Sequence, residues 1–304
     1  MLKQSQVQDA DILSQINTKA VALKSEKKTL LNNRYYCDKE LGKGGLSIVY
    51  EGSDTYAKYF NDNKKLAIKV PSKSLLKMKD IAAFVYSEYR ILQQLQHDNI
   101  VKVYDFGIDE VNAFPYIVLE KLEGQLLMDV SLHSMSKKIK KKLFFSLYGA
   151  IEYMHEKGVI HADINPNNIM VLDDGTIRLF DFGISQTTGT KKRFNLAFKK
   201  VNAYNPRYSA PEVLDGEVPT RKSDLFSLAC VMFEVYTHEL PFKVSSQELK
   251  DKPLTRSQLM KVPLRFRSWF KNALQVHISE RNVTPFQALW IQPKMCKMLL
   301  NHKK

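Results

Sequence analysis

The chain has few cysteines and no long apolar run. Only three of its 304 residues are cysteine, and Cys37, Cys230 and Cys296 lie far apart with no CxxC pair among them. This spacing indicates neither a disulfide framework nor a zinc site, and it fits a reducing compartment. No apolar stretch approaches the length of a membrane span, and the N-terminus lacks a signal-peptide core. We therefore expect a soluble protein that is cytoplasmic, or delivered into a host cell if the source is a pathogen.

Acidic residues are also in the minority. The 46 lysines and arginines outnumber the 32 acidic residues and give a net charge of +14. Such an excess can indicate nucleic acid, an acidic membrane face or a phosphorylated ligand as partner. The lysines come in short blocks that are typical of solvated faces and loops, and no nucleic-acid-binding signature accompanies them. We therefore expect no nucleic-acid partner and no membrane span.

The composition changes along the chain in a way that predicts two lobes. Residues 1–33 have apolar positions at helical spacing, which predicts an N-terminal helix that packs on the body of the protein, with docking or regulation as the alternative. Residues 34–119 are strand-rich, with one helix near 80–95, whereas the later part is mainly helical. The pattern predicts an α+β protein with a small β-rich lobe, a connection at 120–124 and a larger helical lobe at 125–300.

Two features of the strand-rich part could belong to a phosphate site. Gly42, Gly44 and Gly45 lie between two strand-like runs, where backbone N–H groups can face a polyphosphate; a plain hairpin is the alternative. Lys69 stands in the apolar strand LAIKV, and Glu88 lies on the helix that follows. An ion pair between them would neutralise a buried ammonium, whose desolvation is otherwise costly. An edge-strand lysine with an exposed glutamate is the alternative.

The helical part carries a polar loop that contains no lysine or arginine. HADINPNN, residues 161–168, holds one His, one Asp and three Asn between two apolar runs. IRLFDFGIS then places Asp181 directly after a strand, YSAPEVL follows at 208–214, and KSDLFSLACVMFEVYT opens a buried-looking helix with Asp224. Carboxylates and amides supply the hard oxygen ligands that Mg²⁺ prefers.

Taken in order, these motifs resemble those of the protein kinase family. The order is glycine loop, strand Lys, helix Glu, H-x-D-x-x-x-x-N, D-F-G, A-P-E and helix Asp, and the resemblance covers about residues 34–300. It implies the two-lobed protein kinase fold, ATP and Mg²⁺ as cofactors, and a protein substrate. The loop GKGGLS, with Ser47 at the third glycine position, is similar to that of bacterial Ser/Thr kinases of eukaryotic type.

The resemblance also implies a role for each matched residue. Asp163 would accept the proton of the attacking hydroxyl, and Lys69, held by Glu88, would bind the α- and β-phosphates. Asn168 and Asp181 would bind Mg²⁺. The implied nucleotide-binding residues are Gly42, Gly44, Gly45, Val49, Ala67, Lys69, Glu120, Leu122 and Met170.

Several internal contacts are implied in the same way. Glu212 would pair with Arg281 and brace the larger lobe. A spine of side chains anchored at Asp224 would tie the lobes together; its members would be Leu92, Val103, His161 and Phe182. A second Asp-Phe-Gly begins at Asp105 but precedes the H-x-D motif, so we interpret Asp105 as a strand-end turn residue and Asp181 as the metal ligand.

The catalytic loop departs from the common H-R-D-L-K-P-x-N at two positions. Asn165 replaces the Lys that touches the transferring phosphate, and it can donate a hydrogen bond but no charge. We expect the missing cation to come from the basic residues at 191–200. Ala162 replaces the Arg that binds a phosphate on the activation segment, so we expect activity that does not depend on such phosphorylation. The alternative is that Arg207 binds that phosphate instead.

Three functions remain open at this point. The first is an ATP-dependent protein kinase, and Tyr208 before SAPE favours Ser/Thr over Tyr as acceptor, although Asn205 replaces the family's Thr. The second is a pseudokinase scaffold, for which Asn165 is the best argument. The third is an atypical kinase or a kinase of small molecules, against which the A-P-E segment and the Asp224 helix argue. In each case a regulatory partner is possible.

Overall fold

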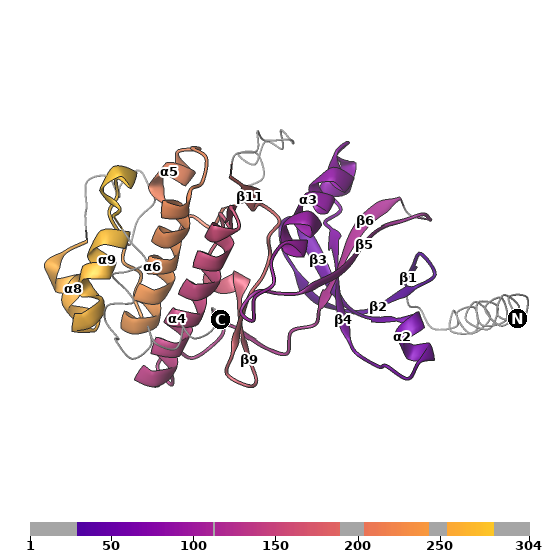
Figure 1. Ribbon diagram of the computed structural model, residues 1–304, viewed down its shortest axis with the longest axis horizontal. Coiled ribbons are helices and arrows are strands. Elements are labelled where there is room, and N and C mark those ends of the chain that lie inside the picture. Colours follow the sequence, from indigo (N-terminus) through magenta and orange to yellow (C-terminus); the bar gives the residue numbers. More distant parts are fainter. Residues whose placement is uncertain (1–28, 112, 189–203, 243–253, 283–304) are drawn as a thin grey trace, which may run out of the picture. The chain divides into compact units, whose positions relative to one another are not determined.

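The computed structural model describes residues 29–111, 113–188, 204–242 and 254–282 (Figure 1). Contacts divide the chain into two compact units. The first comprises Met1–Gln93 and Val101–Leu122, and the second comprises Gln94–Ile100 and Glu123–Lys304. The helix predicted within residues 1–33 falls almost entirely outside the described residues. In the part of the chain that the structure describes, no helix is both long enough and apolar enough to cross a membrane.

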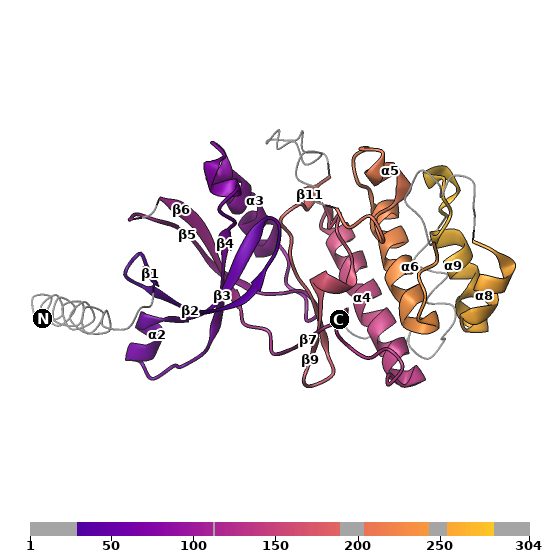
Figure 2. The ribbon, with the colours of Figure 1, turned by 180° about the vertical axis from the view of Figure 1, so that it is seen from behind.

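The first unit is built on a six-stranded antiparallel sheet in the order β1-β2-β3-β4-β6-β5. Its strands, seen from behind in Figure 2, are β1 (Thr29–Leu31), β2 (Tyr35–Lys43), β3 (Ser47–Asp54), β4 (Leu66–Pro71), β5 (Val103–Asp109) and β6 (Phe114–Glu120). The helical elements of this unit are α2 (Thr55–Tyr59), η2 (Leu75–Lys77) and α3 (Ile81–Gln93). Helix α3 packs on β5 and β6 through an apolar face that includes Phe84, Ile91 and Leu92.

Contacts between the start and the end of the sheet hold it in a curled shape. The β1–β2 turn reaches β5, where the backbone N–H of Asn32 donates to Asp109 Oδ1 at 3.1 Å. Asp105 accepts from the Arg34 guanidinium at 3.1 Å and from the Tyr35 hydroxyl at 2.7 Å. The interpretation of Asp105 as a strand-end turn residue is therefore wrong. It lies inside β5, and its carboxylate ties that strand to β2 and the turn before it.

The second unit is mainly helical. Its helices are α4 (Lys137–Glu156), α5 (Pro211–Leu214), α6 (Arg221–Thr237), α8 (Arg256–Lys261) and α9 (Arg267–Ala273). Its short 3₁₀ turns are η3 (Pro166–Asn168), η5 (Leu264–Phe266) and η6 (Ile278–Glu280). Its strands are β7 (Gly124–Leu126), β8 (Val159–Ile160), β9 (Ile169–Leu172), β10 (Ile177–Leu179) and β11 (Gln186–Thr187), paired as β10-β9-β7 and β11-β8.

Helix α6 runs through the core of the second unit. It begins with a capping box, in which the Thr220 side chain accepts from the Ser223 N–H while Ser223 Oγ accepts from the Thr220 N–H. Most of its residues are buried, as expected of a helix that is apolar on nearly every side. Aromatic side chains from α4 and α9 complete this core, with the ring centroids of Phe144 and Trp269 4.9 Å apart. The first unit is thus rich in strands and the second is mainly helical, as predicted for the two lobes.

Candidate active site

Lys69 and Glu88 form the ion pair that the sequence predicts. Strand β4 carries the lysine and α3 carries the glutamate, and Lys69 Nζ lies 2.6 Å from Glu88 Oε1. The two side chains are only 10% and 4% exposed. Because each buried charge neutralises the other, neither carries the full desolvation cost alone. The pair is confirmed, and its role toward phosphate stays a prediction.

The glycine turn between β2 and β3 leaves its backbone uncovered. Gly44 closes the turn with a 2.8 Å hydrogen bond from its N–H to the Ser47 carbonyl. A Cβ added at Gly42 or Gly45 would meet no atom within 4 Å, and neither residue has a positive φ. Neither packing nor backbone conformation therefore requires glycine at these two positions. Close approach of a ligand to the backbone is a reason that would require it.

Register places three of the predicted nucleotide-binding residues in one region of the first sheet. Val49 of β3 pairs with Lys69 of β4, and Ala67 of β4 pairs with Leu119 of β6. Directly opposed residues project to the same face, and so do alternate residues of one strand. Val49, Ala67 and Lys69 therefore share a face.

The other predicted nucleotide-binding residues end or follow strands. The N–H of Glu120, the last residue of β6, donates to the Lys102 carbonyl at 2.9 Å, so only its carbonyl can be offered to a base. Leu122 ends the first unit. Met170 lies in β9 of the second unit.

Asp163, in the catalytic loop of the second unit, is held by several hydrogen bonds. Asn168 Nδ2 donates to its carbonyl at 2.8 Å and to its carboxylate at 2.7 Å, and the Asn205 N–H donates to the carboxylate at 3.4 Å. Burial, reinforced by the nearby charge of Asp181, raises the pKa of Asp163 to about 6. The carboxylate is still mostly ionised at neutral pH, as a group that accepts a proton must be.

Two oxygen ligands suited to Mg²⁺ lie close to Asp163. Because Asn168 Nδ2 is directed to Asp163, the amide oxygen of Asn168 is turned away from it. Asp181 follows β10 with a left-handed φ of 63°, and its carboxylate is close enough to raise the pKa of Asp163. A carboxylate and an amide oxygen are a hard donor set, so the residues present fit this ion. The assignment of Asn168 and Asp181 as metal ligands stays a prediction.

Asn165 is held inside the loop. It is buried and caps the turn η3: its side-chain oxygen accepts from the Asn167 N–H at 2.9 Å, and its Nδ2 donates to the Asp163 carbonyl at 3.2 Å. Both ends of the amide are therefore used to shape the loop around Asp163. The amide nitrogen carries two N–H groups and the bond to the Asp163 carbonyl uses one of them, so the predicted catalytic contact of Asn165 with phosphate stays a prediction.

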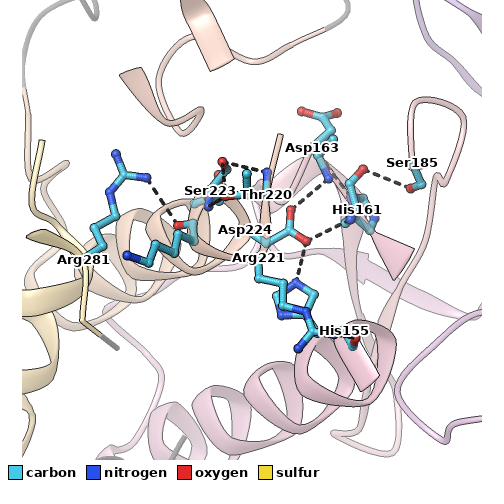
Figure 3. Close-up of polar contacts among 12 residues, drawn as sticks. His155, His161, Asp163, Ser185, Thr220, Arg221, Ser223, Asp224 and Arg281 are labelled. Atoms are coloured by element: carbon cyan, nitrogen blue, oxygen red, sulfur yellow. Dashed lines mark hydrogen bonds and ion pairs between the residues drawn. The ribbon is translucent and has the colours of Figure 1, made fainter. Parts of the chain in front are cut away.

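Asp224 organises the backbone that leads to Asp163 (Figure 3). Its carboxylate accepts from the N–H groups of His161 and Ala162 and from His155 Nε2, each at 2.9 Å. Ala162 has a left-handed φ of 70°, which a non-glycine residue adopts only at an energetic cost. The two N–H bonds to Asp224 offset that cost. In Figure 3 the Asp163 carboxylate points away from this cluster.

The bracing contacts predicted within the second unit are present. Arg281 meets Glu212 through two short bonds, Nη1 to Oε1 at 2.6 Å and Nη2 to Oε2 at 2.7 Å, and both residues are buried. The His161 and Phe182 rings lie 4.7 Å apart. The part of the spine made by Leu92 and Val103 would join the two units and stays a prediction.

Some functional contacts were not predicted from the sequence. His155 lies in the last turn of α4, and its carbonyl accepts a hydrogen bond from Arg221. The activation segment after Asp181 has four candidate phosphate acceptors: Ser185, Thr187, Thr188 and Thr190. Of these, Ser185 donates its hydroxyl to the His161 carbonyl at 3.0 Å. Thr187 lies in β11 and pairs with Val159. The sequence offers one indication of a role for His155, its place at a helix end shortly before His161, and this does not identify Asp224 as its partner. The basic residues at 191–200 lie outside the described residues.

Comparisons with known proteins decide the family. A model of the protein kinase domain matches residues 35–300. The chain belongs to the protein kinase family. It is 30% identical to a probable serine/threonine-protein kinase of Streptomyces coelicolor over 239 residues, which are 75% of this chain and 34% of that protein. The kinase resemblance and the two-lobed fold inferred from the motifs are thus confirmed.

Other bacterial relatives agree. Serine/threonine-protein kinase PknB of Mycobacterium leprae is 29% identical over 239 residues, which are 75% of this chain and 37% of that protein. A probable PknB of Lactococcus lactis is 32% identical over 217 residues, which are 69% of this chain and 32% of that protein. The chain therefore spans about a third of the length of these curated relatives.

Proposed function

We propose that the chain is an ATP- and Mg²⁺-dependent protein kinase that transfers the γ-phosphate of ATP to a Ser or Thr hydroxyl of a protein. The observation that carries the proposal is the group formed by Asp163, Asn168 and Asp181. The two carboxylates are partly buried and close together, and the charge of Asp181 adds to burial in raising the pKa of Asp163, an arrangement that costs stability. A scaffold that only binds partners gains nothing from this arrangement, whereas phosphoryl transfer needs it. The names of the relatives support the same activity.

Each residue of the proposal has a definite task. Lys69, kept in place by Glu88, binds phosphate oxygens of ATP, and the uncovered glycine turn donates backbone N–H groups to them. Asn168 and Asp181 hold Mg²⁺, which when bound neutralises charge on the phosphates. Asp163 orients the acceptor hydroxyl and takes up its proton on a carboxylate oxygen.

The Ser/Thr preference and the mode of control are parts of the same proposal. Tyr208, whose place before Ser-Ala-Pro-Glu favours a Ser or Thr acceptor, is buried and donates its hydroxyl to Glu234 at 2.7 Å. Ala162 presents only a methyl group, so it cannot bind a phosphate on the activation segment. Control then comes from a bound partner, from the N-terminal segment or from expression alone.

A two-stage experiment tests the proposal. Nucleotide binding is measured with and without Mg²⁺, and transfer of labelled phosphate is then measured on a generic protein such as casein and on small hydroxyl compounds. We expect Mg²⁺-dependent binding of ATP and labelling of protein serine or threonine. Binding without any transfer would identify a scaffold, and transfer to small compounds alone would identify a small-molecule kinase. Either result would refute the proposal.

A further inference from the structure

Glu51 is a buried carboxylate to which the reaction described above gives no task. It lies in β3, is 8% exposed, and is the target of three lysines. Lys65 and Lys121 place Nζ 3.1 Å from its oxygens, and Lys39 places Nζ at 3.7 Å. The bonds from Lys121 and Lys65 lower the pKa of Glu51 to about 2, so the carboxylate is charged at every physiological pH.

Sheet register places Glu51 on the face proposed for the nucleotide. Glu51 pairs directly with Ala67, and Val49, two residues earlier on β3, pairs with Lys69. Opposed residues and alternate residues share a face of a sheet. Glu51 therefore belongs to the same face as Val49, Ala67 and Lys69, but at the end nearer residue 120.

The three lysines are not equivalent. Lys121 is 19% exposed, whereas Lys65 is 45% and Lys39 71% exposed. A pair in which both partners are shielded from water is stronger and more sensitive to geometry than one with an exposed partner. Lys121 also lies between Glu120 and Leu122, whose backbone groups are those proposed to meet adenine. Of the three pairs, Glu51–Lys121 is therefore the one that can fix the path of that backbone.

The opposite side of the same segment is also held. The Lys102 N–H donates to Glu120 Oε1 at 2.9 Å, and the Glu120 N–H donates to the Lys102 carbonyl at 2.9 Å. Glu120 is thus fastened toward β5 while Lys121 is fastened toward β3. Two attachments on opposite sides fix both the position and the rotation of a strand end, which one attachment cannot do.

We propose that Glu51 is a positioning residue for nucleotide binding: through Lys121 it holds the backbone of Glu120 and Leu122 in the conformation that receives adenine. This inference rests on the proposed function. It assigns Glu51 no contact with ATP, and it predicts that losing the pair weakens nucleotide affinity with little change in turnover at saturating ATP.

The charge of Glu51 makes the test decisive, because a purely electrostatic effect and a loss of positioning change the affinity for ATP in opposite directions. Removing a negative charge near the site would by itself strengthen binding of anionic ATP and leave uncharged adenosine unaffected. Loss of positioning would instead weaken binding of both ligands to a similar extent, since both present the same base. Adenosine and ATP with Mg²⁺ are therefore titrated side by side by calorimetry.

The variants are Glu51→Gln, Lys121→Met, the conservative Lys121→Arg, and the matched control Lys39→Met, which removes an exposed lysine from the same carboxylate. We expect Glu51→Gln and Lys121→Met each to weaken both ligands about 10-fold, and the double variant to be no worse than either single one. Lys121→Arg and Lys39→Met should stay within about 2-fold of wild type. If Glu51→Gln fails to unfold cooperatively, Lys121→Met decides the matter.

Three outcomes would overturn the inference. Tighter ATP binding with unchanged adenosine binding in Glu51→Gln would show that the charge acts only through space. Unchanged binding of both ligands in Lys121→Met would show that the pair positions nothing. If wild type itself binds neither adenosine nor ATP, the proposed function fails and this inference fails with it. The first two outcomes leave the proposed function intact.

Discussion

The two units differ in what surrounds the charged side chains at their functional centres: an opposite charge in the first unit and neutral hydrogen-bond donors in the second. In the first unit, Lys69 and Glu88 are a full ion pair with almost no exposure. In the second, the donors to the Asp163 carboxylate are asparagine side chains and a backbone N–H, with no direct cation among the described residues. Its pKa is raised as a result, since neutral donors offset burial and the charge of Asp181 only in part.

Under the proposed function, this difference separates a charge that Lys69 must keep from a proton that Asp163 takes up transiently. A lysine that binds phosphate must stay charged, and a buried carboxylate ensures this. A carboxylate that takes up a proton works better when its proton affinity is moderately raised. Asn165 and Ala162 extend the contrast, because both replace cations of the family pattern with uncharged side chains. The second unit thus holds its functional carboxylate with hydrogen bonds and backbone conformation, whereas the first unit holds its functional lysine with an opposite charge.

The largest effect should come from removing a carboxylate of the second unit. We expect Asp163→Ala or Asp181→Asn to lower phosphate transfer at least about 10²-fold, because each removes a preorganised charge contact. Asp105→Asn is the matched control, since Asp105 begins the second Asp-Phe-Gly but serves the sheet. It should retain turnover while lowering the unfolding temperature. Wild-type turnover in both Asp163→Ala and Asp181→Asn would contradict the kinase proposal.

Breaking the ion pair of the first unit should act on stability as well as on activity. Glu88→Gln removes the carboxylate that neutralises a buried ammonium and should lower the free energy of unfolding by about 3 kcal/mol. The double variant Glu88→Gln with Lys69→Met should recover part of that loss in chemical denaturation, but no activity. If Glu88→Gln unfolds like wild type, the pair does not carry the buried charge assigned to it.

The missing cation of the second unit can be sought directly. Replacing the basic residues at 191–200 one at a time by alanine should reveal one position whose loss lowers turnover about 10-fold and ATP affinity much less. Small and equal effects at every position would rule out this segment as the source.

Asn165→Lys tests the same missing charge from the other direction, because it restores the lysine that the family pattern has at this position of the catalytic loop. We expect turnover to rise, because the cation offsets charge on the transferring phosphate. Lysine cannot accept the Asn167 N–H as Asn165 does, so the variant should lose about 1 kcal/mol of stability. A loss of turnover with unchanged stability would show that the contribution of Asn165 is chemical rather than structural.

The smallest effect concerns phosphorylation of the activation segment. Protein made free of phosphate should keep turnover within about 2-fold of wild type, because no arginine stands at position 162 to bind a phosphate. A variant with Thr187, Thr188 and Thr190 changed to alanine should behave alike. Adding Ser185→Ala should cost about 1 kcal/mol of stability, since that hydroxyl bonds the His161 carbonyl. Collapse of activity in the phosphate-free protein, with recovery after autophosphorylation, would contradict this reading of Ala162.

Much of the site could be predicted from the sequence because phosphoryl transfer requires particular residue types in a particular order. The Lys69–Glu88 pair followed from the cost of burying an ammonium, and the Glu212–Arg281 pair was implied by the kinase resemblance; in both, the partners lie within bonding distance. Helix limits were also close: the helix expected near residues 80–95 is Ile81–Gln93. The two-lobed fold followed from the change between strand and helix patterning. These features depend on local periodicity and on chemistry that few residue types can perform.

Only the tertiary structure decided the contacts between residues that share no local sequence pattern. Asp105 is followed by Phe-Gly-Ile, as Asp181 is, yet it ties β5 to Arg34 and Tyr35, about 70 positions away. Asn165 could be recognised as a missing charge but not as the cap of a turn. Nothing in the sequence marks Glu51 of β3 and Lys121, which follows β6, as a pair; the folded sheet brings them together. The physical reason is the same in each case. A buried polar side chain bonds to whichever partner the folded backbone brings near, and sequence spacing alone does not specify that partner.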